Sequence, residues 1–124
     1  MRIHIITDGL MVLSRRVEYW LDRNEFIGPS FIYGHGYYEL TDRKIQRDKF
    51  IAEALETTFD FNSVIDFGCG AGGLLSYFDN HGYEVRGVEG NIAALDEAVI
   101  SPLNIVIHDL RTSYEPERMY DLAT

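Results

Sequence analysis

The feature that most constrains this chain is a cluster of glycines between a short apolar segment and an amphipathic one. Residues 64–67 read Val-Ile-Asp-Phe, and glycines follow at Gly68, Gly70, Gly72 and Gly73. A glycine-rich turn between a buried strand and a helix lets a ligand approach the backbone, because side chains would collide with it there. Glycine spacing alone does not select the ligand, since a dinucleotide fingerprint would also find its third glycine at Gly73.

Apolar, strand-like blocks alternate with amphipathic, helix-like blocks around this turn. Strands are predicted over residues 64–67, 83–89 and 103–108, and a fourth opens at 120–123. Helices are predicted over 41–58, 72–80 and 91–98; Thr41 and Asn91 cap the first and third, and Gly82 ends the second. Alternation at this spacing predicts an α/β fold in which crossover helices flank a parallel sheet.

The helix after Thr41 is expected to have one buried face and one solvent-exposed face. Asp42 lies in its first turn, where the helix dipole favours an acid. The residues expected inside are Ile45, Ile51, Ala54, Leu55 and Thr58. The residues expected in solvent are Arg43, Arg47, Asp48 and Glu56.

Residues 1–40 differ in texture from the rest and are expected to form a cap-like, helical and aromatic extension. Residues 10–23 carry an apolar stripe at helical spacing, which indicates packing against a core rather than partner binding. Residues 24–40 interleave glycines with aromatic rings, among them Tyr33, Tyr37 and Tyr38. Such a loop could fold over a flat ligand, or its rings could pin an irregular segment to the surface. Residues 41–124 hold the alternating α/β part.

Asp66 narrows the choice of ligand, because it lies inside the predicted strand and just before the first glycine. A carboxylate there repels a pyrophosphate but attracts an ammonium or a sulfonium. The run Val-Ile-Asp-Phe-Gly-Cys-Gly-Ala-Gly at 64–72 resembles the first motif of the class I S-adenosylmethionine-dependent methyltransferases at every position. The resemblance extends from about Lys44 to the last residue. It implies a Rossmann-like fold, S-adenosylmethionine as cofactor and methyl transfer as activity.

Two further acids fall where this resemblance implies cofactor contacts. Glu89 ends the second predicted strand, where the family's acid accepts the ribose hydroxyls. Asp109 follows the third strand, where the family's acid meets the adenine amino group, and Leu110 could offer its amide to the ring. Ligands of open parallel sheets bind at the carboxyl ends of the strands, where these acids lie. The residues expected to bind the cofactor are Asp66, Gly68, Cys69, Gly70, Gly72, Glu89, Gly90, Asn91, Asp109 and Leu110.

Several of these residues also have simpler explanations. Glu89 could cap the helix that follows it, and Asp109 alone could be a turn former. Their joint placement after successive strands favours the cofactor site. Cys69 could be a nucleophile near a helix N-terminus, but the resemblance puts a small residue there merely for packing, and the catalytic residue stays unidentified. Gly90 departs from the family pattern of an apolar residue against adenine, so Ile92 or another residue would have to supply that contact.

Composition bounds the expected partners. The chain has 11 Lys and Arg against 20 Asp and Glu, a net charge of −9, which argues against a surface for nucleic acid or an anionic membrane. We therefore expect a small-molecule methyl acceptor. A single cysteine and the lack of a signal-peptide pattern favour the cytoplasm. The histidines show no metal-ligand spacing, so no metal is expected.

Two rival functions stay open. A NAD(P)-binding oxidoreductase shares the glycines and the ribose acid, although Asp66 and Asp109 argue against it. A non-catalytic module that binds the cofactor or a partner is the other rival. The fourth predicted strand begins at Tyr120 and the sequence stops at Thr124, so we expect a chain truncated after the start of that strand. Residues 41–124 would then be the S-adenosylmethionine-binding half of a methyltransferase domain.

Overall fold

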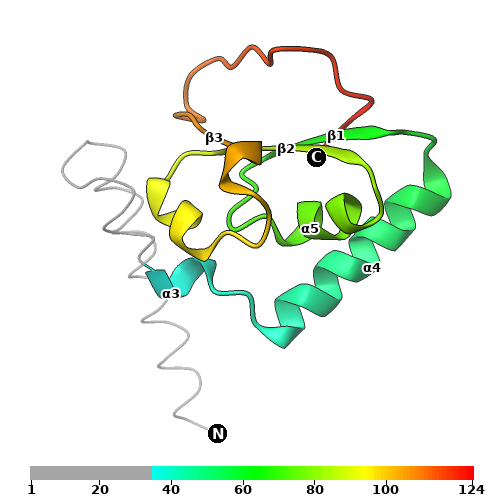
Figure 1. The fold of residues 1–124 in the computed structure, drawn as a ribbon, viewed down its shortest axis with the longest axis horizontal. Helices are drawn as coiled ribbons and strands as arrows, with labels where there is room; N and C mark the ends of the chain where they lie inside the picture. Colours follow the sequence, from blue (N-terminus) through cyan, green and yellow to red (C-terminus); the bar gives the residue numbers. More distant parts are fainter. Residues whose placement is uncertain (1–34) are drawn as a thin grey trace, which may run out of the picture. The chain divides into compact units, whose positions relative to one another are not determined.

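Residues 35–124 are described by a computed structural model, and they form a parallel sheet with helices on one face (Figure 1). The elements are α3 (His35–Tyr38), α4 (Asp42–Thr58), β1 (Ser63–Phe67), α5 (Gly73–Asn80), β2 (Glu84–Glu89), η1 (Ile92–Glu97), η2 (Pro102–Asn104), β3 (Ile105–Ile107) and β4 (Leu122–Ala123). The helix predicted over 10–23 and the side chain of Tyr33 lie outside the described residues. In the part that is described, no helix is long and apolar enough to cross a membrane.

The four strands are parallel and follow the order β3-β2-β1-β4. The chain runs outward from β1 through β2 to β3 and then returns to the other side of β1, where Val64 pairs with Leu122. This reversal makes a topological switch point beside β1, and ligands of open α/β sheets bind at such points. The predicted α/β, Rossmann-like parallel sheet is confirmed.

The core lies between the sheet and the helices α4 and α5. Inward-facing strand residues such as Val64 and Val85 pack against Leu75 and Phe78 of α5, and all four are buried. Alternate strand residues point to this face, as the two-residue period of a strand requires. The helix α5 runs to Asn80, and Gly82 follows at φ +84°, the left-handed conformation that was predicted to end it.

The helix α4 begins where it was predicted but buries a different face. The hydroxyl of Thr41 accepts a hydrogen bond from the amide of Lys44 at 3.4 Å. Its two buried residues are Asp48 and Ala52, whereas Ile45 and Ile51 are 46% and 39% exposed. Ala54 and Thr58, also expected inside, are exposed, and only Leu55 is half-buried. The prediction was wrong because α4 packs along α5, so the burial of each residue depends on that neighbour.

Two other elements differ from their predictions. The segment after Asn91 is a 3₁₀ helix, η1, and not an α-helix, although Asn91 caps it by accepting a hydrogen bond from Ala93 N at 3.1 Å. The third strand starts only at Ile105, because Pro102 begins the short helix η2 and has no amide to donate to a sheet.

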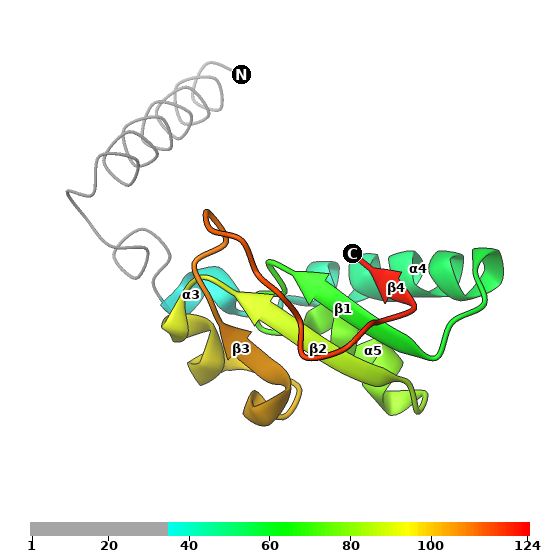
Figure 2. The same ribbon diagram turned by 90° about the horizontal axis from the view of Figure 1, so that it is seen from above.

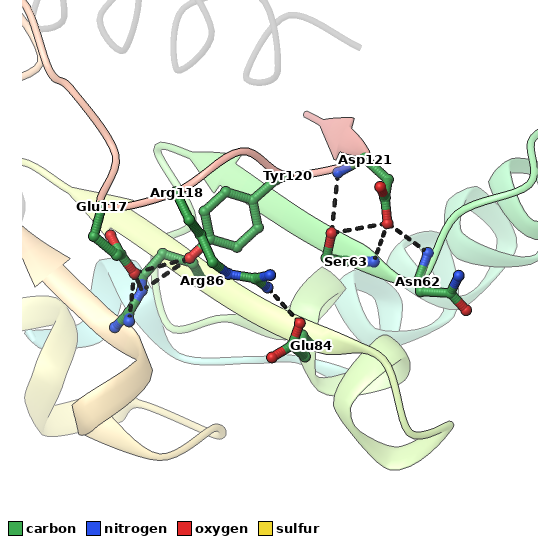
Figure 3. A network of polar contacts seen from close by, with 8 residues as sticks. All are labelled: Asn62, Ser63, Glu84, Arg86, Glu117, Arg118, Tyr120 and Asp121. Atoms are coloured by element: carbon green, nitrogen blue, oxygen red, sulfur yellow. Dashed lines mark hydrogen bonds and ion pairs between the residues drawn. The ribbon is translucent and has the colours of Figure 1, made fainter.

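The connection from β3 to β4, residues 108–121, crosses the sheet face opposite the helices (Figures 1 and 2). Figure 3 shows how its end is fixed. The carboxylate of Asp121 accepts hydrogen bonds from the amides of Asn62 and Ser63, both at 3.0 Å, and from the Ser63 hydroxyl at 2.9 Å. Arg86 of β2 forms an ion pair with Glu117 at 2.7 Å. Polar contacts therefore join this connection to the first residues of β1 and to β2.

Candidate functional site

The glycine turn after β1 is held in a conformation that suits glycine. Gly68, Gly70 and Gly72 have φ values of +80°, +56° and +83°, a region that other residues rarely adopt. The amides of Gly68 and Cys69 donate to the carbonyl of Val88 at 2.7 and 3.3 Å. The turn is thereby fastened to β2 and lies at the carboxyl edge of the sheet.

The glycines of this turn differ in the neighbours that an added Cβ atom would meet. A Cβ on Gly72 would come within 2.9 Å of Ile100, and one on Gly73 would overlap Asp48. These two positions are glycine because the protein's own side chains pack there. A Cβ on Gly68 or Gly70 would make only ordinary van der Waals contact, with Leu110 at 3.9 Å and with Tyr38 at 3.6 Å. At Gly68 and Gly70 the positive φ, and not a steric clash, is therefore what favours glycine.

Glu89 lies at the end of β2 beside this turn and is 9% exposed. One carboxylate oxygen accepts a hydrogen bond from Gly70 N at 2.9 Å, and the other accepts one from Asn91 N at 3.1 Å. A carboxylate offers about four acceptor positions, so these two bonds leave others for a ligand. Glu89 thus holds the turn and the start of η1 in place while keeping acceptor capacity.

Asp66 lies on β1 opposite Gly87 of β2 and is partly buried. Burial raises its pKa, and the charges of Asp48 and Glu89 raise it further, while a hydrogen bond with the side chain of Thr124 lowers it. The carboxylates of Asp66 and Glu89 therefore place negative charge beside the glycine turn, whereas that of Asp48 is ion-paired to Arg47. Positive charge is favoured in such a place.

Asp109 follows β3 at the same edge of the sheet. Its carboxylate accepts hydrogen bonds from Nε of Arg111 and from a terminal guanidinium nitrogen, both at 2.9 Å, and from the Arg111 amide at 3.0 Å. These bonds lower the pKa of Asp109 to about 2, so it is charged at neutral pH. Its neighbour Leu110 is 42% exposed, and its side chain faces Gly68.

The surroundings of Cys69 do not suit a nucleophile. The residue is 8% exposed and belongs to the hydrophobic core, and a Cβ on Gly87 would lie 2.5 Å from its sulfur. Burial, together with the nearby charges of Asp66 and Glu89, raises the pKa of the thiol to about 12. A reactive cysteine needs a lowered pKa and access, so the packing explanation holds for Cys69.

The structure brings most of the sequence-predicted residues to one edge of the sheet. Gly68, Gly70, Glu89 and Asn91 are joined to one another or to β2 by hydrogen bonds. A Cβ on Gly90 would lie 3.7 Å from the His108 carbonyl, and Ile92 is 63% exposed. Among the described residues, no group of three or more His, Cys, Asp or Glu could hold a metal ion.

Two residues near the turn were not predicted to belong to the site. Asp48 was placed in solvent but is 7% exposed, with its carboxylate against Gly73 and ion-paired to Arg47 at 2.7 Å. In sequence it stands among charged residues, and only its spacing from Ala52, one helical turn later, hints at a shared buried face. The side chain of Arg47 is 64% exposed, and the ion pair with Asp48 holds it near the glycine turn.

The parallel sheet, its strand order and the glycine turn after β1 define a Rossmann-like class I methyltransferase fold. Residues 34–124 match a family model described as a methyltransferase domain. The chain belongs to this methyltransferase-domain family. No curated protein sequence matches it significantly.

Two solved structures share the fold. The PH0226 protein from Pyrococcus horikoshii OT3 is 16% identical with a TM-score of 0.56, over 82% of this chain and 49% of that one. The plantazolicin methyltransferase BpumL in complex with SAH is 20% identical with a TM-score of 0.55, over 96% of this chain and 49% of that one. The chain thus spans about half the length of these structural neighbours.

Proposed function

We propose that residues 41–124 bind S-adenosylmethionine and that the protein transfers its methyl group to an acceptor. The observation that carries the proposal is the placement of Asp66, Glu89 and Asp109 at the carboxyl ends of three adjacent strands, beside the glycine turn that follows β1. Membership of the methyltransferase-domain family supports it. A structural neighbour that was solved with SAH agrees with it.

Each acid has a proposed partner on the cofactor. Glu89 accepts hydrogen bonds from the ribose hydroxyls through the acceptor positions that Gly70 and Asn91 leave over. Asp109 accepts one from the adenine amino group, and the exposed side chain of Leu110 or Ile92 covers the ring. Cys69, Gly90 and Gly72 contribute through their backbone and packing. Asn91 contributes by orienting Glu89.

Asp66 discriminates between cofactor classes. Its carboxylate, with those of Asp48 and Glu89, disfavours the two negative charges of a dinucleotide pyrophosphate. The same carboxylates favour the ammonium and the sulfonium of S-adenosylmethionine. This argues against the oxidoreductase alternative, because that site would place its phosphates on the glycine turn.

Methyl transfer needs no acid or base group to activate the donor. Bound S-adenosylmethionine supplies an activated methyl group, which an acceptor lone pair displaces from sulfur while the sulfonium becomes a neutral thioether. The task of this chain's residues is to hold the donor in line with an acceptor and to keep water out. Asp66 and Glu89 do this by fixing the two ends of the donor on rigid strands.

We propose a small molecule as the methyl acceptor and the cytoplasm as the location. The net charge of −9 supports an acceptor other than nucleic acid, because phosphates would be repelled. The one buried, unpaired thiol, Cys69, is compatible with a reducing compartment. Exposed Tyr37, next to the turn-facing Tyr38, offers an aromatic surface near the proposed donor site.

Calorimetric titration with S-adenosylmethionine, S-adenosylhomocysteine and NADH tests the proposal. We expect heat of binding with the first two and none with NADH. Glu89→Ala should weaken binding by about 1.5–3 kcal/mol, the value of hydrogen bonds to a charged group. Asp60→Ala removes an exposed acid from the loop before β1 and should leave binding unchanged. A folded protein that binds NADH and not S-adenosylhomocysteine would overturn the assignment.

The non-catalytic alternative calls for a different measurement. Transfer of a radioactive methyl group from S-adenosylmethionine to a panel of small acceptors, compared with nucleic acid, would establish activity. Binding without transfer to any acceptor would favour the binding module over the enzyme.

A further inference from the structure

Tyr38, the last residue of α3, packs directly against the glycine turn. Its side chain is 6% exposed, and its ring carbon Cδ1 would lie 3.6 Å from a Cβ built on Gly70. It forms a small buried cluster with Ala71 of the turn and Ala94 of η1. One ring therefore bridges α3, Gly70 of the turn and the helix that follows Glu89.

The preceding residue, Tyr37, has the same side chain in a different environment. It is 55% exposed, and its ring meets that of Tyr38 edge to face, with centroids 5.2 Å apart and planes at 80°. The two tyrosines thus form a natural pair for comparison, because only Tyr38 reaches Gly70.

A second tie connects α3 to α4. The ammonium of Lys44 donates hydrogen bonds to the carbonyls of Tyr37 and Glu39, each at 2.9 Å. It also lies 5.9 Å from the centre of the Tyr37 ring. A cation at the carbonyl end of a helix is favourable. The segment is therefore fastened by an ammonium on one side and by the Tyr38 ring on the other.

We propose that Tyr38 is a positioning residue that couples the docking of α3 to ligand binding at the glycine turn. The proposal rests on the proposed function, in which S-adenosylmethionine binds at that turn. Tyr38 packs against Gly70, and the carboxylate of Glu89 holds Gly70 by accepting a hydrogen bond from its amide. A ligand that is stabilised by docked α3 must stabilise the docking of α3 by the same factor, because coupling between two equilibria is reciprocal.

The experiment combines calorimetry with hydrogen exchange on the full chain, using S-adenosylhomocysteine as the probe. In the wild type, the probe should slow exchange in residues 35–41 as well as in the turn. Y38A should weaken binding about tenfold or more and abolish the probe-dependent slowing in 35–41, while β1 stays protected. Y38F, which keeps the ring that packs on Gly70, should retain the probe-dependent slowing. Y37A, which removes a ring that contacts Tyr38 but leaves Tyr38 in place, should have a smaller effect than Y38A.

The outcomes separate the two proposals. Wild-type binding together with unchanged affinity and unchanged probe-dependent protection in Y38A would overturn the coupling alone. Absence of binding by the folded wild type would overturn the proposed function, and the coupling with it. Should Y38A fail to fold, K44M provides the same test. It removes the hydrogen bonds from the Lys44 ammonium to α3 and leaves the core intact. Normal binding and normal protection of 35–41 in K44M would then count against the coupling.

Discussion

At the scale of single residues, Asp66 and Glu89 lie on neighbouring strands, yet their carboxylates meet different surroundings. Glu89 accepts two backbone amides, at 2.9 and 3.1 Å, which stabilise its charge in a buried place. Asp66 is partly buried beside other acids, and both effects raise its pKa. Its charged form is therefore less favourable in the folded chain than in the unfolded one. A carboxyl group with a pKa raised in this way is typical of a binding site.

Asp66→Asn should therefore stabilise the ligand-free protein at neutral pH. Because the folded pKa of Asp66 is raised, its penalty is present above that pKa and is lost as the pH falls through it. Urea unfolding at pH 7 should show a higher free energy of unfolding for the variant, and the gain should vanish in acid. Affinity for S-adenosylmethionine should fall. Asp60→Asn, at an exposed position, serves as control; a D66N protein less stable than wild type at pH 7 would contradict this account.

At the scale of elements, the contact between α4 and the first turn of α5 decides how the site is supported. Gly72, the N-cap of α5, has no side chain to cap the helix. Asp48 of α4 places its carboxylate against Gly73, the first residue of α5. Negative charge is favourable at a helix N-terminus. The burial of Asp48 is thus explained by a helix that needs a charge from another element.

Gly73→Ala tests this contact because two effects predict opposite changes in stability. Helix propensity alone predicts a gain of up to about 1 kcal/mol for alanine over glycine. The added Cβ would instead overlap the carboxylate of Asp48 and lie 3.1 Å from a methyl group of Leu40. Because both are the ends of side chains that can shift, we expect a loss of only about 1 kcal/mol. Chemical unfolding of G73A, D48A and the double variant measures the change in the free energy of unfolding. The loss should be smaller in the D48A background, and equal losses in both backgrounds would show that Asp48 is not the obstacle.

At the scale of the whole described unit, the connection from β3 to β4 takes the place of a helix on the second face of the sheet. Asp121 ends it at β1, and Arg86 of β2 holds Glu117 (Figure 3). The same connection starts with Asp109 at the proposed site. Anchoring its far end therefore helps fix where Asp109 begins.

Asp121→Asn should lower the melting temperature at pH 7 and less so in acid. The hydrogen bonds from Asn62 and Ser63 lower the pKa of Asp121, so its contribution is present at neutral pH and is lost as the pH falls through the folded value. The difference between variant and wild type should therefore narrow below about pH 4. Differential scanning calorimetry across pH measures it, with Glu115→Gln, an exposed acid of the same connection, as control. A difference independent of pH would show that charge is not involved.

Local patterns in the sequence determined the succession of strands and helices, the glycine turn, and the three acids after three strands. These depend on residue period and on backbone preference, which act between near neighbours in the chain. Only the tertiary structure decided that Asp48 is buried, that Cys69 faces the core and that Gly72 makes room for Ile100. The packing of the Tyr38 ring against Gly70 and η1 was decided at the same level. Burial, pKa and steric room depend on side chains brought together from distant parts of the chain, and no local pattern contains that information.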